Sequence, residues 1–173
     1  MGVETIPPPL QPEPLRCAHF TLPDYRYVPG LQAHPWRSES GHHHTDRLSK
    51  MEPMWWEGVD WCSHDWFLHG CDLFDHRYLW EAHEVWEEIW HAVPKGDPDR
   101  ERIQLLIQAA ACALKVHMGS ISPARSLLER CRQRLEHVEE GLVDCVRLLV
   151  DLERFIDGGE WPRLYGLEGT PKD

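Results

Sequence analysis

Apolar side chains recur every three to four residues along most of the chain from Pro53 onward, and this spacing predicts amphipathic helices. Glycine and proline divide the pattern: Gly70 is expected to stop the first helix, and Pro94 follows the end of the second. Ser122 followed by Pro123 is typical of a helix start. The expected helices cover about residues 53–69, 72 or 75 to 93, 99–118, 122–140 and 142–157.

The connections between these segments predict how the helices pack. Only Pro94–Pro98 separates the second helix from the third, so these two are expected to pack antiparallel. The third helix carries four alanines between residues 109 and 113. These small side chains leave room for bulky neighbours, and we expect Trp86 and Trp90 of the second helix to fill that room. The predicted fold class is therefore all-α, an antiparallel bundle of about five helices.

The first third of the chain does not follow the helical pattern. Eight prolines before Trp36 rule out a long helix and favour extended chain and turns. Apolar residues such as Phe20, Tyr27 and Val28 distinguish this part from a solvated linker, so we expect it to pack against the bundle. The predicted organisation is an irregular, Pro-rich N-terminal arm (1–50), a helical bundle domain (51–160) and a frayed tail (161–173).

Bulk composition excludes several classes of function. A net charge of -11 and a sequence pI near 5.5 provide no basic surface, so neither nucleic acid nor a membrane is an expected partner. The chain has no apolar run of about 18 residues and no signal-peptide pattern, which predicts a cytoplasmic protein. Six cysteines without a Cys-x-x-Cys pair favour neither disulfides nor a thiolate zinc site. Protein partners stay unknown, and a homo-oligomer stays open.

Residues 80–90 hold the densest group of chemically active side chains. His83 and Glu87 are four residues apart, so on a helix they lie one above the other, at the flank of the apolar stripe. Imidazole and carboxylate in this arrangement can act as an acid and a base, or as two ligands of a metal ion. On spacing alone, a structural contact at the edge of the core is the commoner explanation.

The same helix offers further candidates around this pair. Its three tryptophans are expected to wall a pocket, with a glutamate beside them and a glutamine of the third helix reaching across to His83 or Glu87. A solvated flank is the alternative for the glutamine. The candidate pocket residues are Trp80, Glu84, Trp86, Trp90 and Gln108. Helical periodicity places Glu81, Glu84 and Glu88 roughly opposite the apolar stripe, on the solvent side.

The run Leu73–Trp90, followed by Ile103–Ala110, resembles the uncharacterised prokaryotic family known as domain of unknown function 309. That family is marked by a His-x-x-x-Glu-x-x-Trp motif, which corresponds to His83, Glu87 and Trp90 in this chain. The resemblance covers about residues 71–135 and implies a small all-helical fold. It implies no established activity.

Members with a long N-terminal extension carry a pattern similar to Tyr27–Gly30, His34 and Gly41-His42 of this chain. The resemblance thus implies that His34 and His42 join the candidate site from the arm. Arg77 departs from the family pattern, because such members often have glycine at this place. The entry into the second helix is therefore expected to differ.

Two classes of function follow from these residues. The first is a metal-dependent or acid/base enzyme of hydrolytic type, with His83 and Glu87 as catalytic residues, or as ligands of a divalent metal ion together with His34 and His42. The His-Glu-x-x-His element of zinc proteases is absent, and the Glu-x-x-His element that di-iron bundles need on two helices occurs on one predicted helix.

The second class is a non-enzymatic binding or scaffold module. In it the His/Glu/Trp motif is a structural polar core, with tryptophan N–H groups bonded to glutamate carboxylates. The sequence leaves both classes open and identifies no reaction.

Overall fold

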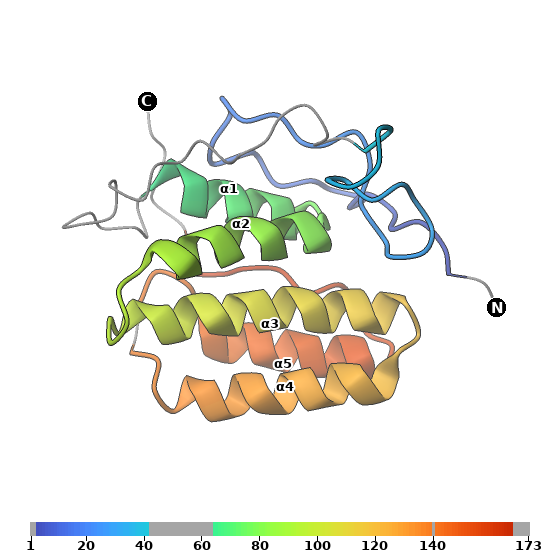
Figure 1. Ribbon diagram of the computed structural model, residues 1–173. Helices are drawn as coiled ribbons and strands as arrows, with labels where there is room; N and C mark the ends of the chain where they lie inside the picture. Colours follow the sequence, from blue (N-terminus) through green and yellow to red (C-terminus); the bar gives the residue numbers. More distant parts are fainter. Residues whose placement is uncertain (1–2, 42–63, 140, 168–173) are drawn as a thin grey trace.

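A computed structural model describes residues 3–41, 64–139 and 141–167 (Figure 1). Within these ranges the chain forms five α-helices and no strand, which confirms the predicted all-α class. The helices are α1 (Asp65–Asp75), α2 (Leu79–Ala92), α3 (Asp99–His117), α4 (Ile121–Leu135) and α5 (Cys145–Ile156). None of these five is both long enough and apolar enough to cross a membrane.

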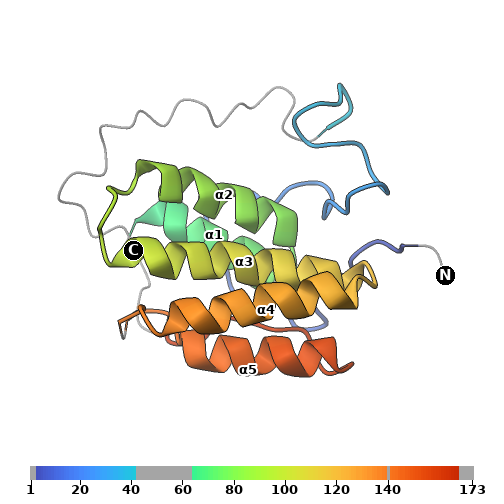
Figure 2. The ribbon, with the colours of Figure 1, turned by 60° about the horizontal axis from the view of Figure 1, so that its bottom comes forward.

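The helices stack in layers around a shared core (Figures 1 and 2). α3 lies in the centre, where it packs against α2 on one side and against α4 and α5 on the other, while α1 packs on α2. Successive helices run in opposite directions, as their short connections require (Figure 1). Ala109, Ala110 and Ala113 of α3 are fully buried, so their small side chains let the neighbouring helices approach closely.

Gly70 does not stop the first helix, contrary to the prediction, but lies inside α1. A Cβ atom at Gly70 would lie 2.5 Å from Nε1 of Trp86, so the indole packs directly on the backbone of α1. Trp86 is fully buried and also contacts Phe67 and Phe74, with ring centroids 6.5 and 5.8 Å away. The indole of Trp86 thus packs on the glycine of α1, a contact that the sequence did not predict. The predicted start of the first helix at Pro53 lies outside the described residues.

α4 and α5 begin at residues other than those predicted. α4 starts at Ile121, so Pro123 lies within its first turn and does not occupy its first position. α5 starts at Cys145 rather than near residue 142, and its N-terminus is capped by Asp144, whose carboxylate accepts a backbone N–H of the first turn at 2.9 Å. The bounds of α3, in contrast, agree closely with the predicted 99–118.

A residue in the left-handed conformation joins α1 to α2. The predicted start of the second helix near residue 72 or 75 is wrong, since α1 ends at Asp75 and α2 begins at Leu79. Between them Arg77 has a φ of 65°, a conformation that glycine adopts at lower cost. Its Nη1 donates to the carbonyl oxygens of Pro7 and Pro8 at 3.1 and 3.2 Å. The arginine at this position therefore ties the start of the chain to the turn between the helices.

The N-terminal segment, residues 3–41, contains turns but no helix or strand, and it lies over α1 and α2 (Figure 1). Ile6, Cys17 and Val28 belong to the core. The backbone N–H of Tyr27 donates to Oε1 of Glu81 at 3.0 Å, and Glu81 is only 2 % exposed. The prediction that Glu81 faces solvent is wrong, because this segment covers that face of α2.

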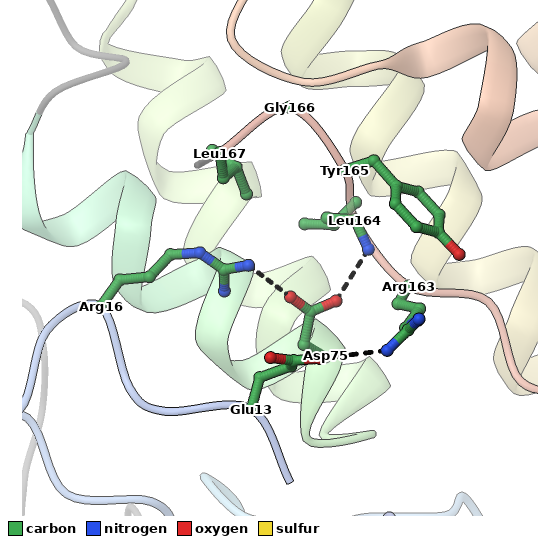
Figure 3. A pocket seen from close by; sticks show the side chains of 8 residues that line it. All are labelled: Glu13, Arg16, Asp75, Arg163, Leu164, Tyr165, Gly166 and Leu167. Carbon is green, nitrogen blue, oxygen red and sulfur yellow. Dashed lines mark hydrogen bonds and ion pairs between the residues drawn. The ribbon is translucent and has the colours of Figure 1, made fainter. Parts of the chain in front are cut away.

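A buried ion-pair network fastens the N-terminal segment and the chain after α5 to α1 (Figure 3). Asp72 accepts the backbone N–H and Nη1 of Arg16, both at 3.0 Å. Asp75 accepts Nη2 of Arg16 at 2.7 Å and the backbone N–H of Leu164 at 2.8 Å. Leu164 is 6 % exposed, so the described residues 161–167 pack against the helices. The remainder of the predicted tail lies outside the described residues.

Candidate functional site

Three polar side chains of α2 gather on the flank of the helix. One side-chain atom each of His83, Glu84 and Glu87 lies within 4.8 Å of the other two. Nε2 of His83 is 3.9 Å from Oε2 of Glu87. We call this group the His/Glu cluster. Imidazole nitrogen and carboxylate oxygen bind divalent ions at about 2.0–2.2 Å, so small side-chain rotations would allow the three residues to share one ion.

The ring of His83 is oriented by the facing helix. Its Nδ1 lies 3.3 Å from the carbonyl oxygen of Ile107 in α3. Because a carbonyl oxygen only accepts, this contact favours a proton on Nδ1 and leaves the lone pair of Nε2 on the side of Glu87. Histidines that bind metal ions commonly use such a backbone contact, which selects the tautomer and holds the ring.

The His/Glu cluster is accessible to solvent. The side chain of His83 is 28 % exposed and that of Glu87 is 45 % exposed. A pair as exposed as this contributes about 0–1 kcal/mol to stability. The pair is therefore a minor structural contact, and an ion or a small molecule has access to it.

Glu84 of the cluster also lines a cleft between α1, α2 and the N-terminal segment. The cleft has a volume of about 290 Å³. Its walls include Trp80 and Glu84 of α2, Trp66 and His69 of α1, and Phe20 and Trp36 of the N-terminal segment. The His/Glu cluster and the cleft therefore form one continuous candidate site.

Burial raises the pKa of the carboxyl groups beside the cleft. For Glu84 burial is the main cause; His83 opposes the rise in pKa and the carboxylate of Glu87 adds to it. Burial raises the pKa of Glu81 to about 8, although the N–H of Tyr27 favours the ionised form. At neutral pH the Glu81 carboxyl therefore holds its proton in most molecules, whereas Glu84 needs a higher pH to ionise than a free glutamate does.

The His/Glu cluster lies in a segment that a known family covers. The family described as Domain of unknown function (DUF309) matches residues 67–127. The family resemblance that the sequence predicted is thus confirmed. Comparisons with curated proteins and with solved structures found no match.

The candidate site extends beyond the segment that matches the family. The cluster, together with Ile107 that orients His83, lies within residues 67–127. Phe20, Trp36 and Trp66 of the cleft lie outside the matched range. The N-terminal segment therefore completes a cleft that residues 67–127 alone would leave open on one side.

His34, which was predicted as a further metal ligand, is not part of the cluster among the described residues. The ring centroid of His34 lies 5.5 Å from that of Trp80, beside the cleft wall. Its Nδ1 accepts the backbone N–H of Trp36 at 3.2 Å, so the neutral ring carries its proton on Nε2 and has no free lone pair there for a metal. His42 lies outside the described residues.

Three of the predicted pocket residues lie in contacts between structural elements rather than in the cleft lining. Trp86 is fully buried on α1. The ring of Trp90 lies under the guanidinium carbon of Arg100, 3.9 Å from its centroid. Oε1 of Gln108 accepts Nε of Arg134 in α4 at 3.2 Å, so it serves the contact between α3 and α4 instead of the motif. Trp80 and Glu84 are the predicted pocket residues that line the cleft.

Most of the cleft wall was not anticipated from the sequence. Phe20, Trp36 and Trp66 come from parts of the chain distant from the motif, and Glu81 was expected in solvent. The one signal was the presence of aromatic residues in the Pro-rich segment, which predicted that this segment packs on the helices. It did not indicate which face of the helices the segment would cover.

Proposed function

We propose that this protein is a metal-dependent enzyme of hydrolytic type, in which His83, Glu84 and Glu87 hold a divalent ion at the edge of the aromatic cleft. One observation carries the proposal: Glu84 belongs both to the His/Glu cluster and to the lining of the cleft. An ion bound there would lie beside a cavity that can hold a substrate. Glu84 would then both hold the metal ion and contact the bound substrate.

The donor set suits this role. One imidazole and two carboxylates are ligands that zinc, manganese and iron accept, and three protein ligands leave coordination positions for water or substrate. A bound divalent ion lowers the pKa of its water toward neutrality, which supplies a nucleophile for hydrolysis. The Nδ1 contact of His83 with Ile107 supports the proposal, because it leaves Nε2 as the ligand atom.

The alternative is a binding or scaffold module whose His/Glu/Trp motif is a structural polar core. Two observations favour the enzyme over this alternative. The His83 and Glu87 side chains are 28 % and 45 % exposed, unlike a polar core. Among the described residues, Nε1 of Trp90, the tryptophan of the motif, is buried without a hydrogen-bond partner, whereas the alternative expects a glutamate carboxylate there. The hydrogen bonds of indoles with glutamates, Trp36 with Glu84 and Trp66 with Glu88, lie outside the motif positions.

The test measures binding of Zn²⁺ and Mn²⁺ to the chelator-treated full-length protein by isothermal titration calorimetry, with metal content of the purified protein measured by mass spectrometry. His83→Ala and Glu87→Gln are each expected to weaken binding at least about tenfold, because each removes one ligand. His91→Ala is the matched control. His91 is an exposed histidine at the end of α2, and its loss should leave the affinity unchanged.

Equal binding by wild type, His83→Ala and His91→Ala would show that the ion binds elsewhere, and no binding by the wild type would exclude the metal site. Either outcome would favour the binding module. If the site is correct, the affinity for the metal ion should rise with pH. The reason is that the raised pKa of Glu84 lets a proton compete with the ion for its carboxylate.

A further inference from the structure

The cleft beside Glu84 is lined by aromatic rings that are held in place before any ligand arrives. On one side Phe20, Trp66 and His69 pack on one another, with centroid distances of 5.3 Å for Phe20 to Trp66, 4.6 Å for Phe20 to His69 and 5.3 Å for Trp66 to His69. On the α2 side, Trp80 meets Tyr27 edge to face at 5.1 Å. Since both sides are fixed by neighbours, a ligand that fits between them binds at little cost in ordering side chains.

The charge of the lining selects against anions. Among the described residues that line the cleft there is no lysine or arginine, whereas Glu81 and Glu84 both contribute to the wall. A carboxylate or phosphate placed between the rings would lose water without gaining a cationic partner. It would also approach the carboxylate of Glu84 in a protein of net charge -11.

The size of the cleft indicates the size of the group that it takes. An apolar cavity of about 150 Å³ is enough to bind benzene. The cleft, at about 290 Å³, therefore has room for a ring system of two fused rings. A flat ring that stacks on an indole or phenyl face gains about 0.5–1.5 kcal/mol of binding free energy beyond that from burying its area. An aliphatic group of equal size does not gain this extra free energy.

We propose that this cleft binds a planar aromatic or heteroaromatic ring that carries no negative charge. The ring is the part of the substrate that anchors it, and it places the reacting group beside Glu84. The assignment of a reacting group rests on the proposed function, but binding of the ring requires no metal ion. The residues that carry the inference are Trp36, Trp66 and Trp80 with Phe20 for stacking, and Glu84 for charge selection.

The test titrates the full-length protein into a ring-fluorinated indole and follows the ligand by fluorine NMR. We expect saturable binding with a Kd of about 1 mM, as is usual for a fragment of this size. Trp36→Leu and Trp80→Leu, which alter half-buried lining residues of the N-terminal segment and of α2, should each weaken binding about tenfold. Trp161→Leu is the matched control, because this half-buried indole packs on Phe155 with centroids 4.6 Å apart. It should leave the affinity unchanged.

The charge requirement is tested on the chelator-treated protein, so that no cation offsets the Glu84 carboxylate, with the same fluorinated ring bearing an acetate group. This anion should bind about tenfold more weakly than the neutral indole. Equal affinity of the two probes would overturn the proposal, as would an equal loss in Trp161→Leu and Trp80→Leu, or the absence of saturable binding to the folded wild type.

His83→Ala separates this inference from the proposed function. His83 does not belong to the cleft lining, so this variant should no longer bind the metal ion but should still bind the fluorinated indole. If the wild type binds the ring but no metal, the proposed function fails and the cleft assignment stands. If it binds metal but no ring, the cleft assignment fails and the metal site stands.

Discussion

Replacing Asp72 by alanine should remove about 3–5 kcal/mol from the free energy of unfolding. The Asp72 carboxylate is 0 % exposed, and it accepts the backbone N–H groups of Arg16 and Cys17 at 3.0 and 2.9 Å as well as Nη1 of Arg16 at 3.0 Å. In Asp72→Ala both backbone donors lose their acceptor, and each buried donor left unpaired costs about 1–3 kcal/mol. The lost contact with Nη1 of Arg16 adds less to this cost, because Asp75 still accepts Nη2 of the same guanidinium at 2.7 Å.

The assay is urea unfolding at neutral pH, followed by far-ultraviolet circular dichroism. Glu13→Gln is the matched control, because it removes another carboxylate that binds an arginine. Glu13 lies 3.0 Å from Arg163, but the two side chains are 49 % and 55 % exposed, so the loss should cost about 1 kcal/mol or less. Asp72→Asn keeps one acceptor oxygen and should fall between the two. A domain of this size has a total stability of about 5–15 kcal/mol, so the shift in Asp72→Ala should be large.

A cost for Asp72→Ala no greater than that for Glu13→Gln would refute this reasoning. It would mean that the N-terminal segment leaves α1 at little cost, so that water replaces the lost acceptor. Limited proteolysis distinguishes this case, because cleavage within residues 3–41 would then become fast while the helices stay intact. The cleft, which takes part of its wall from this segment, would lose its shape at the same time.

Three further changes test other parts of the structure. Burial raises the Glu81 pKa to about 8, so the folded state holds a proton that the unfolded state releases above about pH 4.5. The free energy of unfolding should therefore fall between about pH 5 and 8, with a slope of up to about 1.4 kcal/mol per pH unit. Glu81→Gln should flatten urea midpoints over this interval, and equal slopes in both proteins would contradict the assignment. Gly70→Ala should cost about 1–3 kcal/mol in urea unfolding, because its Cβ would lie 2.5 Å from Nε1 of Trp86; an unchanged midpoint would mean that the indole moves freely. Arg77→Gly should be about 1 kcal/mol more stable than Arg77→Ala in thermal unfolding. Both variants lose the guanidinium contacts, but glycine alone accepts a φ of 65° without strain. Equal stability of the two variants would argue against that conformation.

Features that depend on near neighbours in the chain were predicted from the sequence. The all-α class and the span of α3 follow from apolar periodicity, because a helix repeats every 3.6 residues whatever surrounds it. The proximity of His83 and Glu87 follows from the same geometry, since residues four apart share a helix face. The family assignment rested on a continuous run of residues within one helical region, and it was correct for that reason.

Features that depend on distant segments were decided by the tertiary structure alone. Periodicity placed Glu81 in solvent, but Tyr27 covers it from a segment 54 residues away. Local propensity made Gly70 a helix stop, yet it is the residue that lets Trp86 pack on α1. The ion pairs of Arg16 with Asp72 span 56 residues, and they hold the segment that completes the cleft. Contacts of this range are not encoded in any local pattern, so the charge, burial and aromatic wall of the candidate site emerge only when the chain is folded.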